Sequence, residues 1–427
     1  MTRPWRPPAD RPSVAVVGAG VSGLTAAYLL ARTHNVILIE ADARLGGHAH
    51  THQITDPAGR THAVDSGFIV HNERTYPWLR KLFTELGVQV QPTEMSMSIR
   101  CDECGLEYAG GRGLRGILAQ PGRLLDPEFV RMLAQVKRFH RRAAAFLDSG
   151  DEISTYGQFL RRERFSDYFI THYAVPIVSC VWSAGRELSV QYPARYLFEF
   201  LAHHGMFTLR GFQQWYTVVG GSRSYVERIA SRLPEVRRSH PVTDITRHAD
   251  GVELRDVTGA ATHVDRVVIA THADQALALL ADPSDAEVRT LKAFGYSHNV
   301  TLLHTDAAVL PDAPRARASW NFRMRSCGSP DEPVVVSYWM NRLHGLSTDE
   351  QYVVTLNGQD RVKPGSVLAR MVYEHPVYTA ESVEAQTWLS GLATDRTVYA
   401  GAYHGWGFHE DGCRSGVEAA RHFGVDW

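Results

Sequence analysis

Three glycines near the start of the chain have the spacing that binds the phosphates of a dinucleotide. Gly18, Gly20 and Gly23 stand in the order Gly-x-Gly-x-x-Gly. The first glycine permits a tight turn, the second lets the backbone approach a pyrophosphate, and the third lets a helix pack closely on a strand. Glu40 follows 17 residues after Gly23 and can accept hydrogen bonds from an adenosine ribose. These residues predict dinucleotide binding.

The residues around the glycines have the pattern of the elements that must position them. Residues 14–17 are an uninterrupted apolar run, which is typical of a buried parallel strand. Val21 and Ser22 open a helix that continues over residues 24–31, with its N-terminal amides facing the phosphates. Residues 35–39 predict a second strand. This order of strand, turn, helix and strand predicts an α/β, Rossmann-like domain with a central parallel sheet.

A second glycine pair follows the carboxylate. Arg44, Gly46, Gly47 and His48 would extend the phosphate cradle to the far side of a dinucleotide. The segment resembles the FAD-binding fingerprint of the glutathione-reductase-like flavoproteins, in the branch of monoamine oxidases, protoporphyrinogen oxidases and phytoene desaturases. That branch usually has Arg where this chain has His48, so a titratable group replaces a fixed positive charge near the phosphates.

A third glycine-rich segment lies near the C-terminus. Residues 397–412 resemble the last FAD motif of this branch, with a strand that ends at Gly401 and a helix that we expect from about Cys413. The helix N-terminus would stabilise the anionic reduced flavin. The branch usually has an acidic residue where this chain has Ala402, so one hydrogen bond to the cofactor is missing or supplied elsewhere.

The resemblance covers nearly the whole chain. Residues 65–77, 215–223 and 296–299 resemble a bacterial group of amine-oxidase-like NAD/FAD-binding proteins, whose domain is also fused ahead of plant cyclopropane-fatty-acid synthases. The strand from Val242 resembles one whose backbone contacts the adenine. Together, the motifs and the resemblance imply FAD, bound by Gly18, Gly20, Val21, Ser22, Gly23, Glu40, Arg44, Gly46, Gly47, His48, Gly67, Phe68, Val242, Gly401, Ala402, Phe408 and His409.

The resemblance also implies a discontinuous organisation. We expect the FAD-binding domain to consist of residues 12–80, 211–275 and 385–427. A mixed α+β substrate domain of the monoamine-oxidase and protoporphyrinogen-oxidase type would then comprise residues 81–210 and 276–384.

The candidate catalytic residues lie in two segments. His404, Trp406 and His409 belong to an aromatic and histidine cluster beside the last flavin motif, where aromatic rings could sandwich a substrate and a histidine could move a proton. A packed core with a hydrogen-bonded histidine explains the cluster equally well. Asn299 stands where many amine oxidases of the branch place a lysine near flavin N5, and Lys292 is the nearest lysine.

These features favour an FAD-dependent oxidoreductase that removes a hydride from an apolar molecule by C–N or C–C oxidation. A lipid-like substrate or a secondary metabolite would suit an apolar pocket. Asn299 in the lysine position favours a dehydrogenase, a desaturase or a redox-neutral isomerase or cyclase over a fast oxidase. A flavin-less escort protein on the same fold is a more remote alternative, favoured by His48 and Ala402.

A Cys-x-x-Cys pair stands apart from the flavin motifs. Cys101 and Cys104 predict a hairpin turn, with a redox pair or a metal site as alternatives. Tetrahedral zinc needs two more ligands, and the chain has no second such pair. Cys180, Cys327 and Cys413 stand alone in the sequence. We therefore expect no metal.

Composition limits the partners. Lys plus Arg total 45 against 46 for Asp plus Glu, a balance that argues against binding nucleic acid. Five cysteines are too few for a disulfide framework and indicate a reducing cytoplasm. The uncharged residues 13–31 fit an α/β core better than a membrane span.

Residues 129–146 predict a helix with a basic side, which is a solvated face or a patch for an anionic membrane or an acyl-carrier protein. Its basic residues are Arg131, Lys137, Arg138, Arg141 and Arg142.

Overall fold

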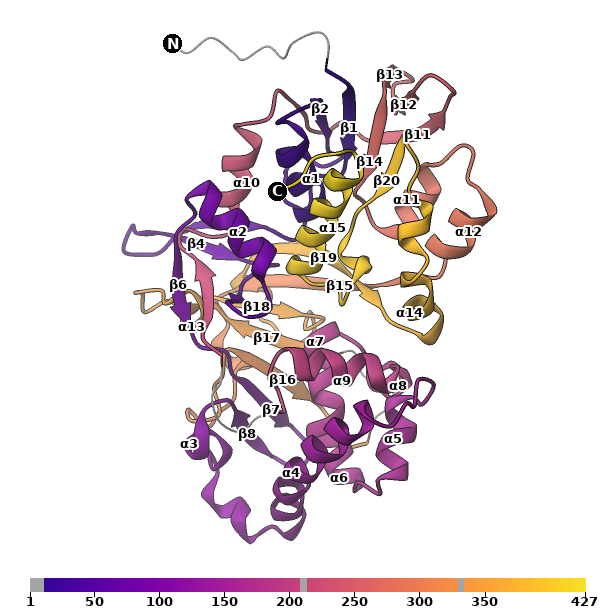
Figure 1. Cartoon of the computed structure of the whole chain (residues 1–427). Coiled ribbons are helices and arrows are strands. Elements are labelled where there is room, and N and C mark those ends of the chain that lie inside the picture. The colour runs from indigo at the N-terminus through magenta and orange to yellow at the C-terminus, as the bar shows by residue number, and fades with distance from the viewer. Residues whose placement is uncertain (1–10, 208–212, 329–333) are drawn as a thin grey trace.

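The computed structural model describes residues 11–207, 213–328 and 334–427. In the upper part of Figure 1, five parallel strands form a sheet in the order β10-β2-β1-β14-β20. They are β1 (Ser13–Val17), β2 (Asn35–Ile39), β10 (Glu235–Arg237), β14 (Arg266–Ile269) and β20 (Thr397–Tyr399). The predicted α/β fold with a central parallel sheet is confirmed.

Both faces of this sheet are buried, which explains the apolar runs of its strands. Val14 and Val16 pack into the layer that holds α1 (Val21–Leu30) and α15 (His409–His422). Ala15 and Val17 point the other way, into the layer that holds α11 (Ala273–Leu279), α12 (Asp285–Leu291) and α14 (Ala380–Gln386). Figure 1 shows α1 and α15 side by side, in indigo and yellow.

A second sheet of seven strands, in the order β19-β15-β18-β17-β16-β7-β8, lies below the first in Figure 1. Its longest pair, β15 and β19, is antiparallel. The strands are β7 (Met97–Cys101), β8 (Glu107–Gly110), β15 (Gly295–His304), β16 (Trp320–Met324), β17 (Val335–Trp339), β18 (Val353–Leu356) and β19 (Val367–Val377).

A group of helices packs against this second sheet and shares an aromatic core with it. The group contains α4 (Pro127–Leu147), α5 (Tyr156–Arg162), α6 (Asp167–Phe169), the π-helical turn Ile170–Ala174, α7 (Val175–Trp182), α8 (Arg186–Gln191) and α9 (Ala194–His203). The helix predicted over residues 129–146 is thus confirmed as α4.

Three small sheets complete the described strands. They are β3 (Thr51–Thr55) with β4 (Thr61–Asp65); β5 (His71–Asn72), β9 (Trp215–Val218) and β6 (Val90–Thr93); and β11 (Val242–Arg247), β12 (Val252–Asp256) and β13 (Ala261–Val264). The other α-helices are α2 (Pro77–Leu86), α3 (Gly113–Ile117), α10 (Arg223–Ala230) and α13 (Met340–His344).

The start of the last helix differs from the prediction. We expect it from about Cys413, but α15 begins at His409. The carboxylate of Asp411 accepts the N–H of Phe408 at 3.0 Å and so caps the helix one turn earlier. Gly412, which suggests a loop in the sequence, lies inside the helix.

The division into two domains stays a prediction, and its boundary between residues 210 and 211 lies outside the described residues. Across the three described ranges, no helix has both the length and the apolar composition that crossing a bilayer requires.

Candidate functional site

The first glycine motif forms the turn between β1 and α1. Gly18 has φ +99°, and a Cβ there would lie 2.7 Å from the carbonyl oxygen of Ala270. A Cβ on Gly23 would lie 1.9 Å from the oxygen of Gly18, so the helix packs directly on the turn. Gly20 differs, because a Cβ there would have no atom within 4 Å. Open space therefore lies beside Gly20 at the N-terminus of α1, where a helix favours anions.

The second glycine pair lies against the first motif. The N–H of Gly46 donates to the oxygen of Ala19 at 2.8 Å, and a Cβ on Gly47 would lie 3.2 Å from the Cα of Gly20. The guanidinium of Arg44 donates to the carbonyl oxygens of its own loop, at Leu45, Gly47 and Ala49. Arg44 thus holds the loop that contains the glycine pair in place.

Glu40 ties the end of β2 to the glycine turn. Its carboxylate accepts the N–H of Ala19 at 2.8 Å and of Asp42 at 2.9 Å. The N–H of His240 donates to the backbone oxygen of Glu40, which brings the start of β11 alongside. Val242 packs on the apolar layer that contains the ends of β1 and β2. Glu40 and Val242 therefore border the same end of the sheet as the glycines.

The C-terminal segment meets the first helix. A Cβ on Gly412 would lie 2.7 Å from the side chain of Val21 and 3.1 Å from Oγ of Ser22. The N–H of Gly401 donates to Oγ of Ser415 at 2.9 Å, so the end of β20 is fixed to α15, and Ala402 follows it. The three glycine segments, which are far apart in the sequence, thus surround one site at the N-terminus of α1.

Gly67 and Phe68 connect these segments. The N–H of Phe68 donates to the oxygen of His48 at 2.7 Å, and a Cβ on Gly67 would lie 2.1 Å from that oxygen. The ring of Phe68 stacks on His409, whose Nε2 is 2.9 Å from the hydroxyl of Tyr225. Burial lowers the pKa of His409 to about 3. His409 is therefore neutral near pH 7, and its part in proton transfer stays a prediction.

Four histidines from distant segments lie near one another. Burial lowers the pKa of His48 well below its ordinary value, and the neighbouring His375, His272 and His409 lower it further. The ring centroid of His48 lies 5.6 Å from that of His375. Nε2 of His48 is buried without a hydrogen-bond partner. A buried polar atom without a partner in such a place suits a ligand.

A polar network that the sequence reasoning missed adjoins His48. Nδ2 of Asn299 lies 3.2 Å from Nδ1 of His375, which is also 3.1 Å from Oγ of Ser183. Oδ1 of Asn299 accepts Nδ2 of Asn357 at 2.9 Å. Ser183 and Asn357 have φ of +54° and +55°, a strained conformation that often marks functional sites. Lys292 lies exposed at the end of α12, whereas Asn299 is buried in β15.

Aromatic side chains form a wall beside the start of α15. Phe408 stacks on Phe200 with ring centroids 5.0 Å apart, and Trp406 lies against Phe200 and His203. Nε1 of Trp182 donates to the backbone oxygen of Trp406 at 3.0 Å. The wall therefore joins α7 and α9 to the C-terminal segment.

His404 lies in the same segment as this wall, and burial lowers its pKa to about 4. Nε2 of His404 and Nε1 of Trp406 are buried without hydrogen-bond partners. His404 is therefore neutral near pH 7, and both side chains have polar atoms that a ligand could satisfy.

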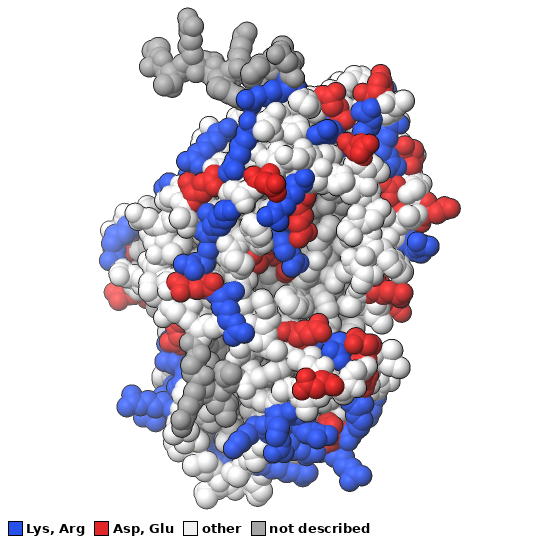
Figure 2. Space-filling view, in the orientation of Figure 1, with Lys and Arg blue, Asp and Glu red and all other residues white. Residues whose placement is uncertain are grey.

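The basic side of α4 lies on a different part of the molecule. Figure 2 shows Lys and Arg side chains gathered where Figure 1 places α4 to α6. Arg142 pairs with Glu163 at 2.6 Å, while Arg131, Lys137 and Arg141 are exposed. Contact with a membrane or an acyl-carrier protein stays a prediction.

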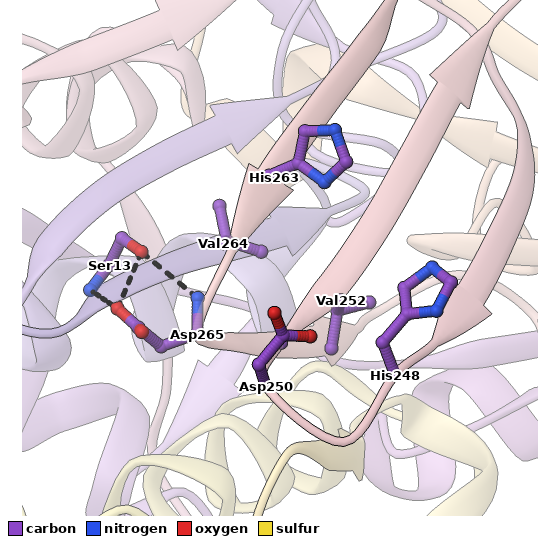
Figure 3. Close-up of a pocket in the computed structure, with 8 residues that line it drawn as sticks. Ser13, His248, Asp250, Val252, His263, Val264 and Asp265 are labelled. Atoms are coloured by element: carbon purple, nitrogen blue, oxygen red, sulfur yellow. Dashed lines mark hydrogen bonds between the residues drawn. The ribbon is translucent and has the colours of Figure 1, made fainter.

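A polar hollow lies at the opposite end of the parallel sheet. Figure 3 shows it beside Ser13, the first residue of β1, with Asp250, His263 and Asp265 among its lining residues. Asp265 accepts both the N–H and the hydroxyl of Ser13 at 2.7 Å. None of the predicted site residues lines this hollow, so it is separate from the site at the glycine turn.

Comparisons with known proteins indicate the family and the fold of the chain. The model of the family described as "Flavin containing amine oxidoreductase" matches residues 21–422. A stretch of 41 residues is 58% identical to an L-amino acid oxidase of Cerastes cerastes, but it covers 9% of this chain and 8% of that protein's length.

Among solved structures, a cyclohexylamine oxidase from Brevibacterium oxydans IH-35A has a TM-score of 0.65 at 17% identity, over 97% of this chain and 98% of the other. A CLA-producing fatty acid isomerase from P. acnes has a TM-score of 0.67 at 16% identity, over 98% and 100%. At these identities, the likeness shows the fold.

Proposed function

The chain belongs to the family of flavin-containing amine oxidoreductases, and we propose that it uses FAD to accept a hydride from an apolar small molecule. The family and its cofactor make the protein an FAD-dependent oxidoreductase. The substrate class and the roles of individual residues belong to the proposal.

The residues at the glycine turn fit FAD. Open space beside Gly20 suits the pyrophosphate, and the N-terminal amides of α1 face it. Glu40 would accept the ribose hydroxyls, and Arg44 and the Gly46-Gly47 pair would hold the second phosphate. The unpartnered Nε2 of His48 would gain a hydrogen bond from the bound cofactor.

Bound FAD supplies a flavin N5 that accepts a hydride. The protein's own task is then to orient the substrate and exclude water. Trp406, Phe408 and Phe200 provide an apolar wall for this purpose. Such a surface favours a substrate whose reacting carbon is part of a hydrocarbon or aromatic skeleton.

The network around Asn299 provides the polar side of the same region. Burial lowers the pKa of His375 to about 4, so its imidazole is neutral near pH 7. Asn299, His375 and Ser183 therefore present hydrogen-bonding groups without a formal charge. This chemistry suits a substrate with one weakly polar group, such as a neutral amine, next to the carbon that is oxidised.

The observation that carries the proposal is the meeting of the three glycine segments at the N-terminus of α1, next to an aromatic wall. The test is an anaerobic screen in which apolar amines, fatty acyl chains and polyenes are mixed with the yellow protein. We expect one class to bleach the flavin absorbance. A protein that cannot bind FAD, or a flavin that no class reduces, would contradict the proposal.

Two tryptophan variants sharpen this test. Trp406→Ala should raise the half-saturating substrate concentration about tenfold or more, because a large apolar contact is lost. Trp388→Ala is the matched control, since Trp388 lies at the surface against Arg289. Equal effects of both variants would remove Trp406 from the substrate pocket.

A redox-neutral isomerase or cyclase is the second candidate. It is favoured by Asn299 in the position where the resemblance to amine oxidases leads us to expect a lysine, and the fold similarity to a fatty acid isomerase agrees with it. Product that forms without matching consumption of an electron acceptor would establish this candidate and exclude net oxidation.

A further inference from the structure

Four metal-ligating side chains converge at the far end of the seven-stranded sheet. Cys101 ends β7, Cys104 follows in the turn before β8, His172 lies in the π-helical turn, and Cys327 follows β16. Their ligand atoms all lie within 4.8 Å of one another. Cys327 and His172 are far from the Cys101 and Cys104 pair in the sequence, and the fold brings all four side chains together.

Three of the distances between the ligand atoms match those of a tetrahedron around zinc. Zinc binds thiolate sulfur at about 2.3 Å and imidazole nitrogen at about 2.0–2.1 Å, so neighbouring sulfurs lie about 3.8 Å apart and sulfur and nitrogen about 3.5 Å apart. Sγ of Cys101 lies 3.5 Å from Sγ of Cys327. Nε2 of His172 lies 3.5 Å from Sγ of Cys327 and 3.7 Å from Sγ of Cys104.

A hydrogen bond orients the histidine of the cluster. Nδ1 of His172 is 3.0 Å from the oxygen of Tyr168 and donates to it, which leaves the lone pair of Nε2 facing the sulfurs.

Further contacts fix the loops that carry these residues. Glu103 accepts the N–H of Cys327 at 2.6 Å, so the turn of the first pair is bonded directly to the loop of the third cysteine. Arg123 donates to the carbonyl oxygen of Cys104, which places a positive charge beside a cluster of thiolates. Asp102 in the same turn accepts from Arg323 and Arg361.

We propose that Cys101, Cys104, His172 and Cys327 bind one zinc ion with a structural role. Three sulfurs and one nitrogen would complete the four ligands of a zinc ion, so no position would be open for water or substrate. Zinc suits this set because thiolate and imidazole are its preferred ligands in closed sites. The ion would join the β7–β8 turn, the helical group and the loop after β16. These three segments are far apart in the sequence.

The test is the metal content of the full, FAD-loaded protein, purified without a histidine tag. We expect about one zinc per chain. Zinc released by a mercurial reagent, and detected with a colorimetric chelator, should match that amount. In the metal-bound protein all five cysteines should titrate as free thiols after denaturation and chelation.

Ligand variants test the assignment. Cys327→Ser and His172→Ala should each weaken zinc retention by more than about tenfold, since even outer-shell changes can cost that much. Cys180→Ala, a buried cysteine outside the cluster, should keep its zinc. Cobalt added to zinc-free protein should give the red-region absorption of a tetrahedral thiolate site, away from the flavin bands.

Two results would overturn the proposal. One is protein without stoichiometric metal that retains five thiols, and the other is protein in which two of the cluster cysteines form a disulfide. Both results are measured on the wild-type protein. The proposal therefore remains testable even if a ligand variant does not fold.

Discussion

The imidazole of His409 lies face to face with the phenyl ring of Phe68, with centroids 3.8 Å apart and planes 9° apart. His409 is the first residue of α15, whereas Phe68 follows the β3–β4 hairpin. The stack therefore joins the C-terminal segment to the loop that contacts His48.

Replacing His409 tests whether it stabilises the site or transfers a proton. His409→Ala should lower the free energy of unfolding by about 1–3 kcal/mol, because the stack and the hydrogen bond to Tyr225 are both lost. The pH profile of flavin reduction should keep its shape, since His409 is neutral near pH 7. Urea unfolding and stopped-flow reduction measure the two effects. The disappearance of an ionisation between about pH 6 and 8 would instead establish proton transfer by His409.

Two glycines in the same motif should respond differently to substitution. Gly20→Val should fold but lose FAD, because its side chain would enter the space beside the α1 N-terminus, where no protein atom lies within 4 Å. Gly23→Val should fail to fold, because its Cβ would lie 1.9 Å from the oxygen of Gly18. Circular dichroism and flavin absorbance distinguish the two. Full flavin occupancy in Gly20→Val would show that the pyrophosphate lies elsewhere.

The buried histidines predict sensitivity to acid. Burial lowers the pKa of eight histidines from an ordinary 6.5 to about 3 or 4, so the folded chain binds fewer protons than the unfolded chain below pH 6.5. Their contribution to stability is complete above about pH 6.5 and is lost as the pH falls towards 4. Burial also raises the pKa of Glu410 to about 7 and of Asp411 to about 6, which acts in the opposite direction but involves fewer groups.

We therefore expect Tm to be at least about 5 °C lower at pH 5 than at pH 7.5. His71→Gln should reduce this dependence, because His71 is 1% exposed and its pKa is about 4. His263→Gln is the control, since the side chain of His263 is 69% exposed. A Tm that is constant over this range would contradict the assignment of neutral buried histidines.

Glu410 links two helices. Its two carboxylate oxygens accept the N–H groups of Trp78 and Leu79 at 2.9 and 3.0 Å, so a residue of α15 caps the N-terminus of α2. Glu410→Ala should lower the free energy of unfolding by about 1–3 kcal/mol. Glu418→Ala on the exposed side of α15 should change it by less than about 0.5 kcal/mol. Equal changes in the two variants would contradict the capping role.

The sequence predicts the elements around the first glycine motif to within a few residues. β1, α1 and β2 depend on local signals, namely an apolar run, glycine spacing and helix periodicity. The start of α15 is predicted four residues late, because the cap formed by Asp411 is not apparent from a segment rich in glycine and aromatic residues.

The side-chain groupings could not be predicted in the same way. Asn299 meets His375 because β15 and β19 pair antiparallel, and the sequence does not specify that register. His172 and Cys327 reach the Cys101 and Cys104 pair only through tertiary folding. Arg44 is close to the glycine pair in the sequence, but its bonds to three carbonyl oxygens depend on the conformation of the loop.

The packing of α15 against α1 has a consequence for biosynthesis. β14 contributes its strand to the parallel sheet some 250 residues after β1, and β20 and α15 follow more than a hundred residues later still. A nascent chain that has emerged from the ribosome only as far as residue 390 therefore exposes one apolar side of α1 and an unpaired edge of β14. The nucleotide fold is complete only after translation of residues 397–422, and until then these apolar surfaces are exposed to aggregation.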